Sequence, residues 1–235
     1  MITKKEQKAI RSLGAKKNRK VLQQFVAEGE KTVRSFLAAG YVPVAIYGTV
    51  ASADLACSII QPDEMRRISQ LKNPSTILAV FPIQKPKKEP NCGRILVLDN
   101  VSDPGNLGTL IRLCHWFGIE HVVCSPDSVD CYNPKVVQAT MGSLAKVHCH
   151  YLELIPFLTS SALPLYGTFL SGDSIHEIDL PKDAIIVFGS EAQGISPDVA
   201  AIIPRAITIP RGTNDGPESL NIATAAAIVM GTLMR

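Results

Sequence analysis

The residues of this sequence best suited to ligand binding begin in a short loop, DNVSDPGNLGTLIR. Gly105, Asn106 and Gly108 lie in its turn, and Arg112 follows in the helix that the turn begins. Glycine lets a backbone approach a ligand closely, and the amide groups at a helix start attract anions. Arginine adds a planar cation that binds phosphate in a bidentate manner. These residue types favour a phosphate-containing ligand.

Two later loops have a similar composition. VFGSEAQGIS carries Glu191 between two glycines, and ITIPRGTNDGPESLNIATAAA carries Ser219 and Asn221 directly before an Ala-rich segment. Each loop follows an apolar run and precedes a helical pattern. Taken singly, such loops are more often ordinary turns and helix caps. Their occurrence together in one chain favours a shared site.

The elements that must position these loops form an alternating pattern. The apolar runs are RILVLD, HVVCS, KVHCH, PLYGTFL, AIIVFG and AITIP. Runs that are apolar on both sides are typical of parallel strands covered by helices on each face. We expect helices at 107–117, capped by Asp103 or Asn106, and after Asn133-Pro134 and Ser196-Pro197. The sequence thus predicts an α/β fold with a parallel sheet.

A proline- and lysine-rich stretch, residues 82–92, is interpreted as a linker between two domains. Residues 1–81 then form a small α/β domain, and residues 93–235 form the larger one. In the small domain we expect a basic helix, a helical FVAEGEKTVRSFLAAG, a strand in YVPVAIYGT, a helix around 63–70 and a strand in STILAVFP.

The charge of the 235-residue chain is unevenly distributed. Residues 1–40 contain ten Lys and Arg against three Asp and Glu, whereas the remainder contains fourteen against eighteen. A basic arm on a mildly acidic body suggests a polyanionic partner such as nucleic acid, although a solvated helix face accounts for the charge equally well. No apolar run approaches the ~20 residues that span a bilayer, so we expect no membrane segment.

The six cysteines form no CxxC pair, and the start of the chain carries no apolar signal segment. We therefore expect reduced thiols and a cytoplasmic protein. The Cys and His residues between 124 and 150 fit no structural zinc spacing, so no metal is expected. The first loop lacks GxGxxG and a suitably placed ribose-binding acid, which argues against a dinucleotide-dependent dehydrogenase.

Taken in order, the three loops resemble the signature motifs of the SpoU family, the RNA ribose 2′-O-methyltransferases of the SPOUT superfamily. The matching segments are DPGNLGTLIR, VFGSEAQGIS and IPRGTNDGPESLNIATAAA, with YNPKVVQATMGSLAKV between the first two. The resemblance covers roughly residues 93–235. More loosely, VAEGEKTVRSFLAAG resembles the family's N-terminal RNA-binding module, which is similar to small ribosomal proteins. The resemblance implies a deep trefoil knot and a homodimer with its active site at the subunit interface.

The resemblance also implies a cofactor, S-adenosyl-L-methionine, and a set of site residues. The implied catalytic residues are Arg112, Asn106, Glu191, Ser219 and Asn221. The implied cofactor-binding residues are Thr168, Gly189, Gly194, Ile209, Ser219 and Leu220. The simpler interpretation makes Arg112 and Glu191 solvated charges and makes Asn106, Ser219 and Asn221 helix caps. The third loop departs from the common form in its longer polar segment 212–217, which leaves its fit around the cofactor open.

The function implied is methylation of a ribose 2′-hydroxyl in structured RNA. The basic arm and the ribosomal-protein-like module favour ribosomal RNA over tRNA as the substrate. A tRNA methyltransferase and a non-catalytic RNA-binding or ribosome-assembly protein on the same fold are the alternatives. The full set of five polar site residues argues against the non-catalytic alternative, because binding alone would not need them.

Overall fold

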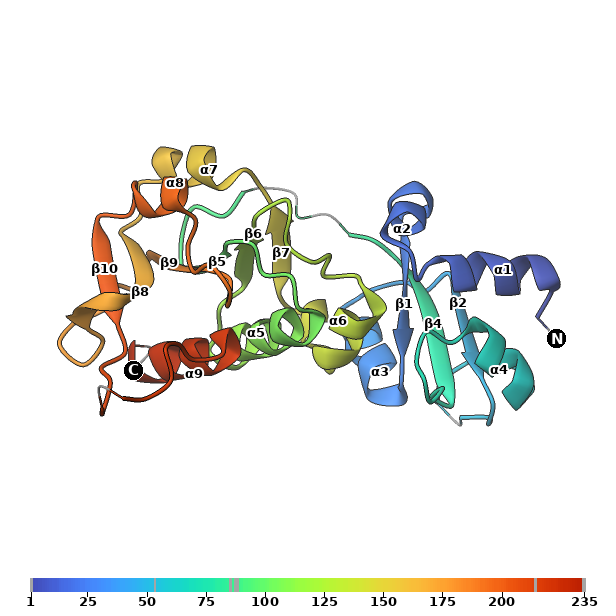
Figure 1. Cartoon of the computed structure of the whole chain (residues 1–235). Coiled ribbons are helices and arrows are strands. Elements are labelled where there is room, and N and C mark those ends of the chain that lie inside the picture. The colour runs from blue at the N-terminus through green and yellow to red at the C-terminus, as the bar shows by residue number, and fades with distance from the viewer. Residues whose placement is uncertain (1, 53, 85, 87–88, 214, 234–235) are drawn as a thin grey trace. The chain divides into compact units, whose positions relative to one another are not determined.

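The computed structural model describes residues 2–52, 54–84, 86, 89–213 and 215–233, which form two compact units (Figure 1). The first unit contains Met1–Lys85 together with Asp130–Lys146, and the second contains Pro86–Val129 and Val147–Arg235. The first unit is therefore discontinuous in sequence. The expected linker, 82–92, includes residues 85, 87 and 88, which lie outside the described residues.

The first unit is built on a four-stranded sheet with the strand order β1-β4-β2-β3. The strands are β1 (Gln24–Glu28), β2 (Ala45–Gly48), β3 (Ser58–Ile59) and β4 (Ile77–Pro82). Strand β4 is antiparallel to both of its neighbours, and its register pairs Phe81 with Phe25 and Val80 with Val26. Because side chains alternate along a strand, the phenylalanines face one side of the sheet and the valines face the other.

Helices cover both faces of this sheet. They are α1 (Lys4–Ser12), α2 (Lys16–Leu22), α3 (Glu30–Ala38), α4 (Pro62–Ile68), α6 (Pro134–Ala139) and the 3₁₀ helix η1 (Ser143–Ala145). Ile10 of α1 and Met65 of α4 join the core on the valine side. On the other side, Phe25 lies against Phe36 of α3 and against Tyr132, with ring centroids 5.1 and 4.6 Å apart.

Two expectations for this unit were wrong. The FVAE part of FVAEGEKTVRSFLAAG is strand β1, and the helix begins only at Glu30. Gly29, with a φ of +91°, separates the two elements, because this conformation interrupts a helix. The single basic helix is two helices, since α1 ends at Ser12 and α2 begins at Lys16.

The second unit is built on a six-stranded sheet with the strand order β10-β8-β9-β5-β6-β7. The strands are β5 (Arg94–Leu98), β6 (His121–Cys124), β7 (His148–Tyr151), β8 (Leu165–Ser174), β9 (Ala184–Phe188) and β10 (Arg205–Thr208). All neighbouring strands run parallel. The expected α/β architecture with a parallel sheet is confirmed.

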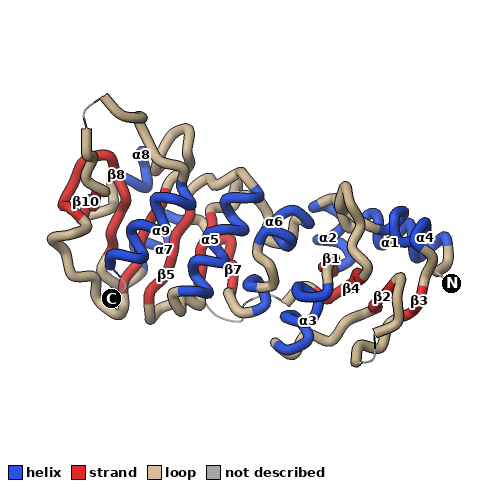
Figure 2. The backbone as a smooth tube through the Cα atoms, turned by 90° about the horizontal axis from the view of Figure 1, so that it is seen from below, coloured by secondary structure: helices blue, strands red, loops and turns tan. Residues whose placement is uncertain are grey.

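Helices α7 (Leu154–Ser160) and α8 (Pro197–Ala200) lie on one face of this sheet, and α5 (Pro104–Trp116) and α9 (Ile222–Leu233) lie on the other (Figure 1). Helices α5 and α9 lie side by side, as the second view also shows (Figure 2). Ile95 and Val97 of the central strand β5 pack with Leu158 and Val199 in one core. Within the described ranges, no helix is long and apolar enough to cross a membrane.

Candidate active site

The first loop runs from the end of β5 into α5. Asp99, almost fully buried, accepts a hydrogen bond at Oδ2 from the backbone N–H of Ser196, 2.7 Å away, and so ties the first loop to the second. Asp103 caps helix α5, because its Oδ1 accepts from the backbone N–H of Asn106 at 2.8 Å. Asp103, and not Asn106, is therefore the N-cap of α5. The side-chain amide of Asn106 is therefore available for other contacts.

The second loop makes a tight turn after β9. A Cβ added at Gly189 would lie 1.9 Å from the backbone carbonyl carbon of Gly194, so only glycine fits there. Ser190 and Gly194 exchange both backbone hydrogen bonds, at 3.0 and 2.8 Å. Gly194 has a φ of +69°, which favours glycine. The turn holds Glu191 at its exposed tip.

The third loop joins β10 to α9. Asn221 caps α9, because its Oδ1 accepts from the backbone N–H groups of Ala223 and Thr224 at 3.0 and 3.3 Å. The cap fixes the side chain and leaves its Nδ2 group free to donate elsewhere. Arg211 donates to the carbonyl of Glu218 within the same loop. Residue 214 of the polar segment 212–217 lies outside the described residues.

The three loops meet through Asn106, Glu191 and Asn221, which we call the Asn–Glu–Asn cluster. Asn106 Nδ2 and Asn221 Nδ2 each donate to Glu191 Oε1 at 2.6 Å, and Asn221 Nδ2 also lies 3.1 Å from Asn106 Oδ1. Residues 115 positions apart in sequence thus share one hydrogen-bond network. Hydrogen bonds to an ionised carboxylate are stronger than neutral ones, so the cluster holds the three loops together at an exposed, polar surface.

Arg112 lies further along α5, roughly 9 Å along the helix axis from Asn106. Its side chain is exposed and lies off the buried stripe of Leu107, Leu110 and Cys114. Within the described part of the chain it has no hydrogen-bond or ion-pair partner. Its guanidinium donors are therefore available to an external anion such as a phosphate.

The other expected site residues lie on the same three loops or beside them. Thr168 of β8 donates through Oγ1 to the carbonyl of Val187 on β9, at 3.1 Å. Ile209 follows β10 and is half-buried, whereas Ser219 is exposed and Leu220 is 43% exposed. The structure joins Asn106, Glu191 and Asn221 directly. It records no hydrogen bond from Ser219 or Arg112 to that cluster among the described residues.

Sequence reasoning missed Asp99, the buried acid that joins the first two loops. An acid at the end of an apolar strand is a visible signal, but its partner, the backbone of Ser196, is 97 residues away. A cavity of about 170 Å³ lined by Arg94, Ile175 and Leu233 contains none of the candidate residues. Among the described residues no group of three His, Cys, Asp or Glu side chains could hold a metal ion.

Comparison with known proteins identifies the class. Residues 93–231 match the SpoU rRNA Methylase family, and the chain belongs to this family. Residues 4–79 match the MRM3-like substrate binding domain. The expected family resemblance is therefore confirmed.

Individual relatives carry more specific names. The chain is 28% identical to the 23S rRNA (guanosine(2553)-2′-O)-methyltransferase RlmP of Bacillus subtilis, over 94% of this chain and 92% of that protein. It is 30% identical to the tRNA (guanosine(18)-2′-O)-methyltransferase of Thermus thermophilus, over 57% of this chain and 71% of that one. It is also 30% identical to the uncharacterised tRNA/rRNA methyltransferase slr1673 of Synechocystis, but that match spans only 65% of the relative.

Solved structures agree with this assignment. A structure of a TrmH-family protein from Porphyromonas gingivalis is 37% identical with a TM-score of 0.88, covering 99% of this chain and 98% of that one. An rRNA methyltransferase from Sinorhizobium meliloti, solved with S-adenosylmethionine bound, is 26% identical with a TM-score of 0.86, covering 99% and 95%. The family uses S-adenosylmethionine, as the sequence resemblance implied.

Proposed function

We propose that this protein transfers a methyl group from S-adenosylmethionine to a ribose 2′-hydroxyl in structured RNA. The observation that carries the proposal is the Asn–Glu–Asn cluster, in which three loops far apart in sequence meet beside the helix that presents Arg112. The names of the relatives point to the same chemistry, since both the Bacillus and the Thermus proteins are named 2′-O-methyltransferases.

The loops offer surfaces that suit the cofactor. Leu220 and Ile209 provide partly exposed apolar side chains for the adenine ring, and the glycine turn at Gly189 and Gly194 lets backbone approach the ligand. Thr168 and Ser219 complete the proposed binding set. S-adenosylmethionine supplies an electrophilic methyl group on a sulfonium, so the protein has mainly to align the accepting oxygen with it.

The polar residues have distinct proposed roles. Arg112 binds an RNA phosphate and orients the neighbouring 2′-hydroxyl; it does not act as a base, because a guanidinium keeps its proton in proteins. Glu191 holds the amides of Asn106 and Asn221 in one arrangement, and these groups with Ser219 face the ribose. The S–CH3 bond breaks as the O–CH3 bond forms, and the proton of the hydroxyl passes late in the transfer to solvent water at this exposed surface.

Ribosomal RNA is the proposed substrate. The match to the Bacillus rRNA enzyme extends over 94% of this chain and so includes its first unit, whereas the match to the Thermus tRNA enzyme spans 57%. Mapping 2′-O-methyl positions in rRNA from cells with and without the protein tests the assignment. Loss of one position supports it, whereas an unchanged rRNA map with a lost tRNA methyl group would favour the tRNA alternative.

We also propose that the protein is a cytoplasmic homodimer. Trp116 at the end of α5 is 84% exposed and Ile228 of α9 is 36% exposed, and both helices lie on one face of the sheet. A second copy of the chain packed on this face would cover both side chains, and closed two-fold dimers are the commonest oligomers of identical chains. Light scattering should give the mass of two chains, and a stable, fully active monomer would contradict the proposal.

The trefoil knot belongs to the same proposal. The cluster supports it, because Asn221, directly before α9, reaches back to the turn that follows β9. In the proposed topology the C-terminal segment passes through the loop that this turn helps to form. A crystal structure in which α9 could be withdrawn without crossing another segment would contradict the knot.

A further inference from the structure

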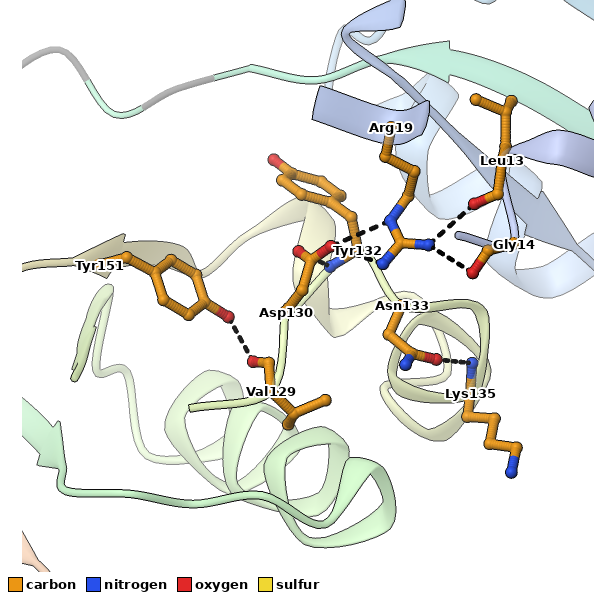
Figure 3. Close-up of polar contacts among 9 residues, drawn as sticks. All are labelled: Leu13, Gly14, Arg19, Val129, Asp130, Tyr132, Asn133, Lys135 and Tyr151. Atoms are coloured by element: carbon orange, nitrogen blue, oxygen red, sulfur yellow. Dashed lines mark hydrogen bonds and ion pairs between the residues drawn. The ribbon is translucent and has the colours of Figure 1, made fainter. Parts of the chain in front are cut away.

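Arg19 belongs to the basic arm in sequence, but its side chain does not face solvent. It is 2% exposed, and each nitrogen of its guanidinium donates a hydrogen bond. Nε and Nη2 donate to Asp130 Oδ2 at 2.9 and 2.6 Å, and Nη1 donates to the carbonyls of Leu13 and Gly14 at 2.8 and 2.9 Å (Figure 3). A buried arginine held in this way connects segments of the protein and does not contact RNA.

Asp130 begins the segment 130–146, which comes between strands β6 and β7 of the second unit but packs in the first. The ring of Tyr132 lies 4.6 Å from that of Phe25, and its hydroxyl donates to the carbonyl of Gln84 at 3.0 Å. Val136 and Val137 of α6 are fully or almost fully buried. The segment is therefore an integral part of the unit that matches a substrate-binding domain.

The residues directly before Asp130 are fixed to the first loop of the candidate active site. The backbone N–H of Val129 donates to the carbonyl of Val101 at 2.9 Å, and the backbone N–H of Val101 donates to Ser128 Oγ at 3.2 Å. From β7, the hydroxyl of Tyr151 donates to the carbonyl of Val129 at 2.6 Å (Figure 3). Hydrogen bonds thus connect residues 128–129 to Val101 of the first loop.

A continuous series of contacts follows from these observations. Arg19 binds Asp130, the peptide bond joins Asp130 to Val129, and Val129 binds Val101. Two residues later, Asp103 caps the helix that carries Asn106. The series leads from the basic arm to the Asn–Glu–Asn cluster through hydrogen bonds and covalent bonds alone.

We infer that Arg19 and Asp130 are positioning residues for methyl transfer: their ion pair transmits RNA binding on the first unit to the loop that carries Asn106. The inference rests on the proposed function. It gives Arg19 a role although its buried side chain cannot contact RNA directly. Coupling through such contiguous networks typically changes by about 0.5–2 kcal/mol on mutation, which corresponds to roughly 2- to 30-fold in rate.

The test compares Asp130→Asn with a matched control, Glu28→Gln, in the full chain. Glu28 is a buried carboxylate of the same unit that accepts hydrogen bonds from Ser69 Oγ and the backbone N–H of Gln70, and among the described residues no hydrogen bond joins its side chain to the series. Each folded variant is assayed for S-adenosylmethionine affinity, for affinity toward deproteinised ribosomal RNA, and for single-turnover methyl transfer. We expect Asp130→Asn to keep both affinities within about twofold and to lose about 2- to 30-fold in transfer rate, while Glu28→Gln keeps the rate.

If Asp130→Asn fails to fold, the double variant Arg19→Met/Asp130→Leu replaces it, because removing both charges leaves no unpaired buried ion. It is expected to show the same loss of rate. A folded variant with the parental rate overturns the inference, as does an equal loss in Glu28→Gln.

Hydrogen exchange separates this inference from the proposed function. Added RNA should protect backbone amides of residues 100–106 in the parental chain and protect them less in Asp130→Asn, whether or not methyl is transferred. Equal protection in both chains overturns the inference. If the protection differs between the two chains but the parental chain transfers no methyl group, the result counts against the proposed function alone.

Discussion

At the scale of single residues, the site depends on which side chain caps each of the helices α5 and α9. Asp103 caps α5, so the side chain of Asn106 can bind Glu191, whereas Asn221 caps α9 with its oxygen and binds Glu191 with its nitrogen. One side chain of the third loop thus serves both a helix end and the cluster. Substitutions of these residues should separate structural from chemical roles.

Arg112→Ala should retain the fold and cofactor affinity but lose methyl transfer, because an exposed arginine that has no hydrogen-bond or ion-pair partner among the described residues contributes little to stability. Losing one charge-assisted contact in the transition state costs roughly 2–4 kcal/mol, about 10²–10³ in rate. Arg112→Lys should recover little, because a point charge cannot replace the planar fork. Single-turnover assays measure both, and parental rates in both variants would make Arg112 an ordinary surface residue.

Glu191 is expected to act as a hydrogen-bond acceptor that fixes two amides. Glu191→Gln keeps an acceptor oxygen and should lower the methyl-transfer rate only a few-fold, whereas Glu191→Ala leaves Asn106 and Asn221 without their shared partner and should cost about 10²-fold. Rates of the two variants under single-turnover conditions decide this. If both fall equally, the negative charge itself takes part in the reaction.

At the scale of elements, strands β6 and β7 bring three histidines together at one edge of the parallel sheet. The register pairs His121 with His148, and His121 Nδ1 lies 3.1 Å from His150 Nε2. Burial, with His121 and His148 close by, lowers the pKa of His150 to about 4. Burial also lowers the pKa of His121, followed by the effect of His148, while Glu120 opposes the shift.

Acidification should therefore weaken this edge of the sheet. An unfolded histidine has a pKa near 6.5, so below that pH the unfolded state binds more protons than the folded one. The stability that the neutral His150 contributes is present above pH ~6.5 and is lost as the pH falls toward ~4, by about 1 kcal/mol at pH 5 after allowance for solvent screening. Denaturant unfolding of the parental chain and His150→Gln over this range tests the prediction. If the free energy of unfolding changes with pH by the same amount in both proteins, the prediction is contradicted.

Most elements of the second unit could be predicted from sequence, because apolar strands such as RILVL and AIIVF are distinct from the amphipathic pattern of α5. Strand β1 could not, since FVAE is short and precedes a true helix, and its pairing with β4 depends on residues at least 50 positions away. The family resemblance is what made Asn106, Glu191 and Asn221 candidates for the site, and their roles stay a prediction. The hydrogen bonds that join Asn106, Glu191 and Asn221 could not be predicted, because they depend on how three loops close in space.

At the scale of the whole molecule, domain organisation was the least predictable feature. The segment 130–146 lies inside the range that matches the SpoU family, yet it completes the core of the first unit. Arg19 and Asp130, 111 residues apart, make this connection through an ion pair in which the arginine is buried and the aspartate partly buried. No local pattern in sequence could indicate that a basic-arm arginine would be buried.

This organisation predicts that removing residues 1–81 will damage the remaining chain. Tyr132, Val136 and Val137 would lose the side chains that cover them, and Asp130 would lose Arg19. Limited proteolysis should therefore cut the truncated chain within 130–146 at protease concentrations that leave the full chain intact there. A truncated chain that resists cleavage at this segment would show that the segment folds without the first unit.

The central claim, ribose 2′-O-methylation of RNA, is tested most directly with the purified full chain, deproteinised ribosomal RNA and S-adenosylmethionine carrying a labelled methyl group. A 2′-O-methyl ribose has no free hydroxyl for alkaline cleavage, so hydrolysis followed by mass spectrometry distinguishes it from a methylated base. The proposed function predicts label in an alkali-resistant dinucleotide, and its loss in Arg112→Ala. Label on a base, or no label in RNA that the protein demonstrably binds together with the cofactor, would contradict it.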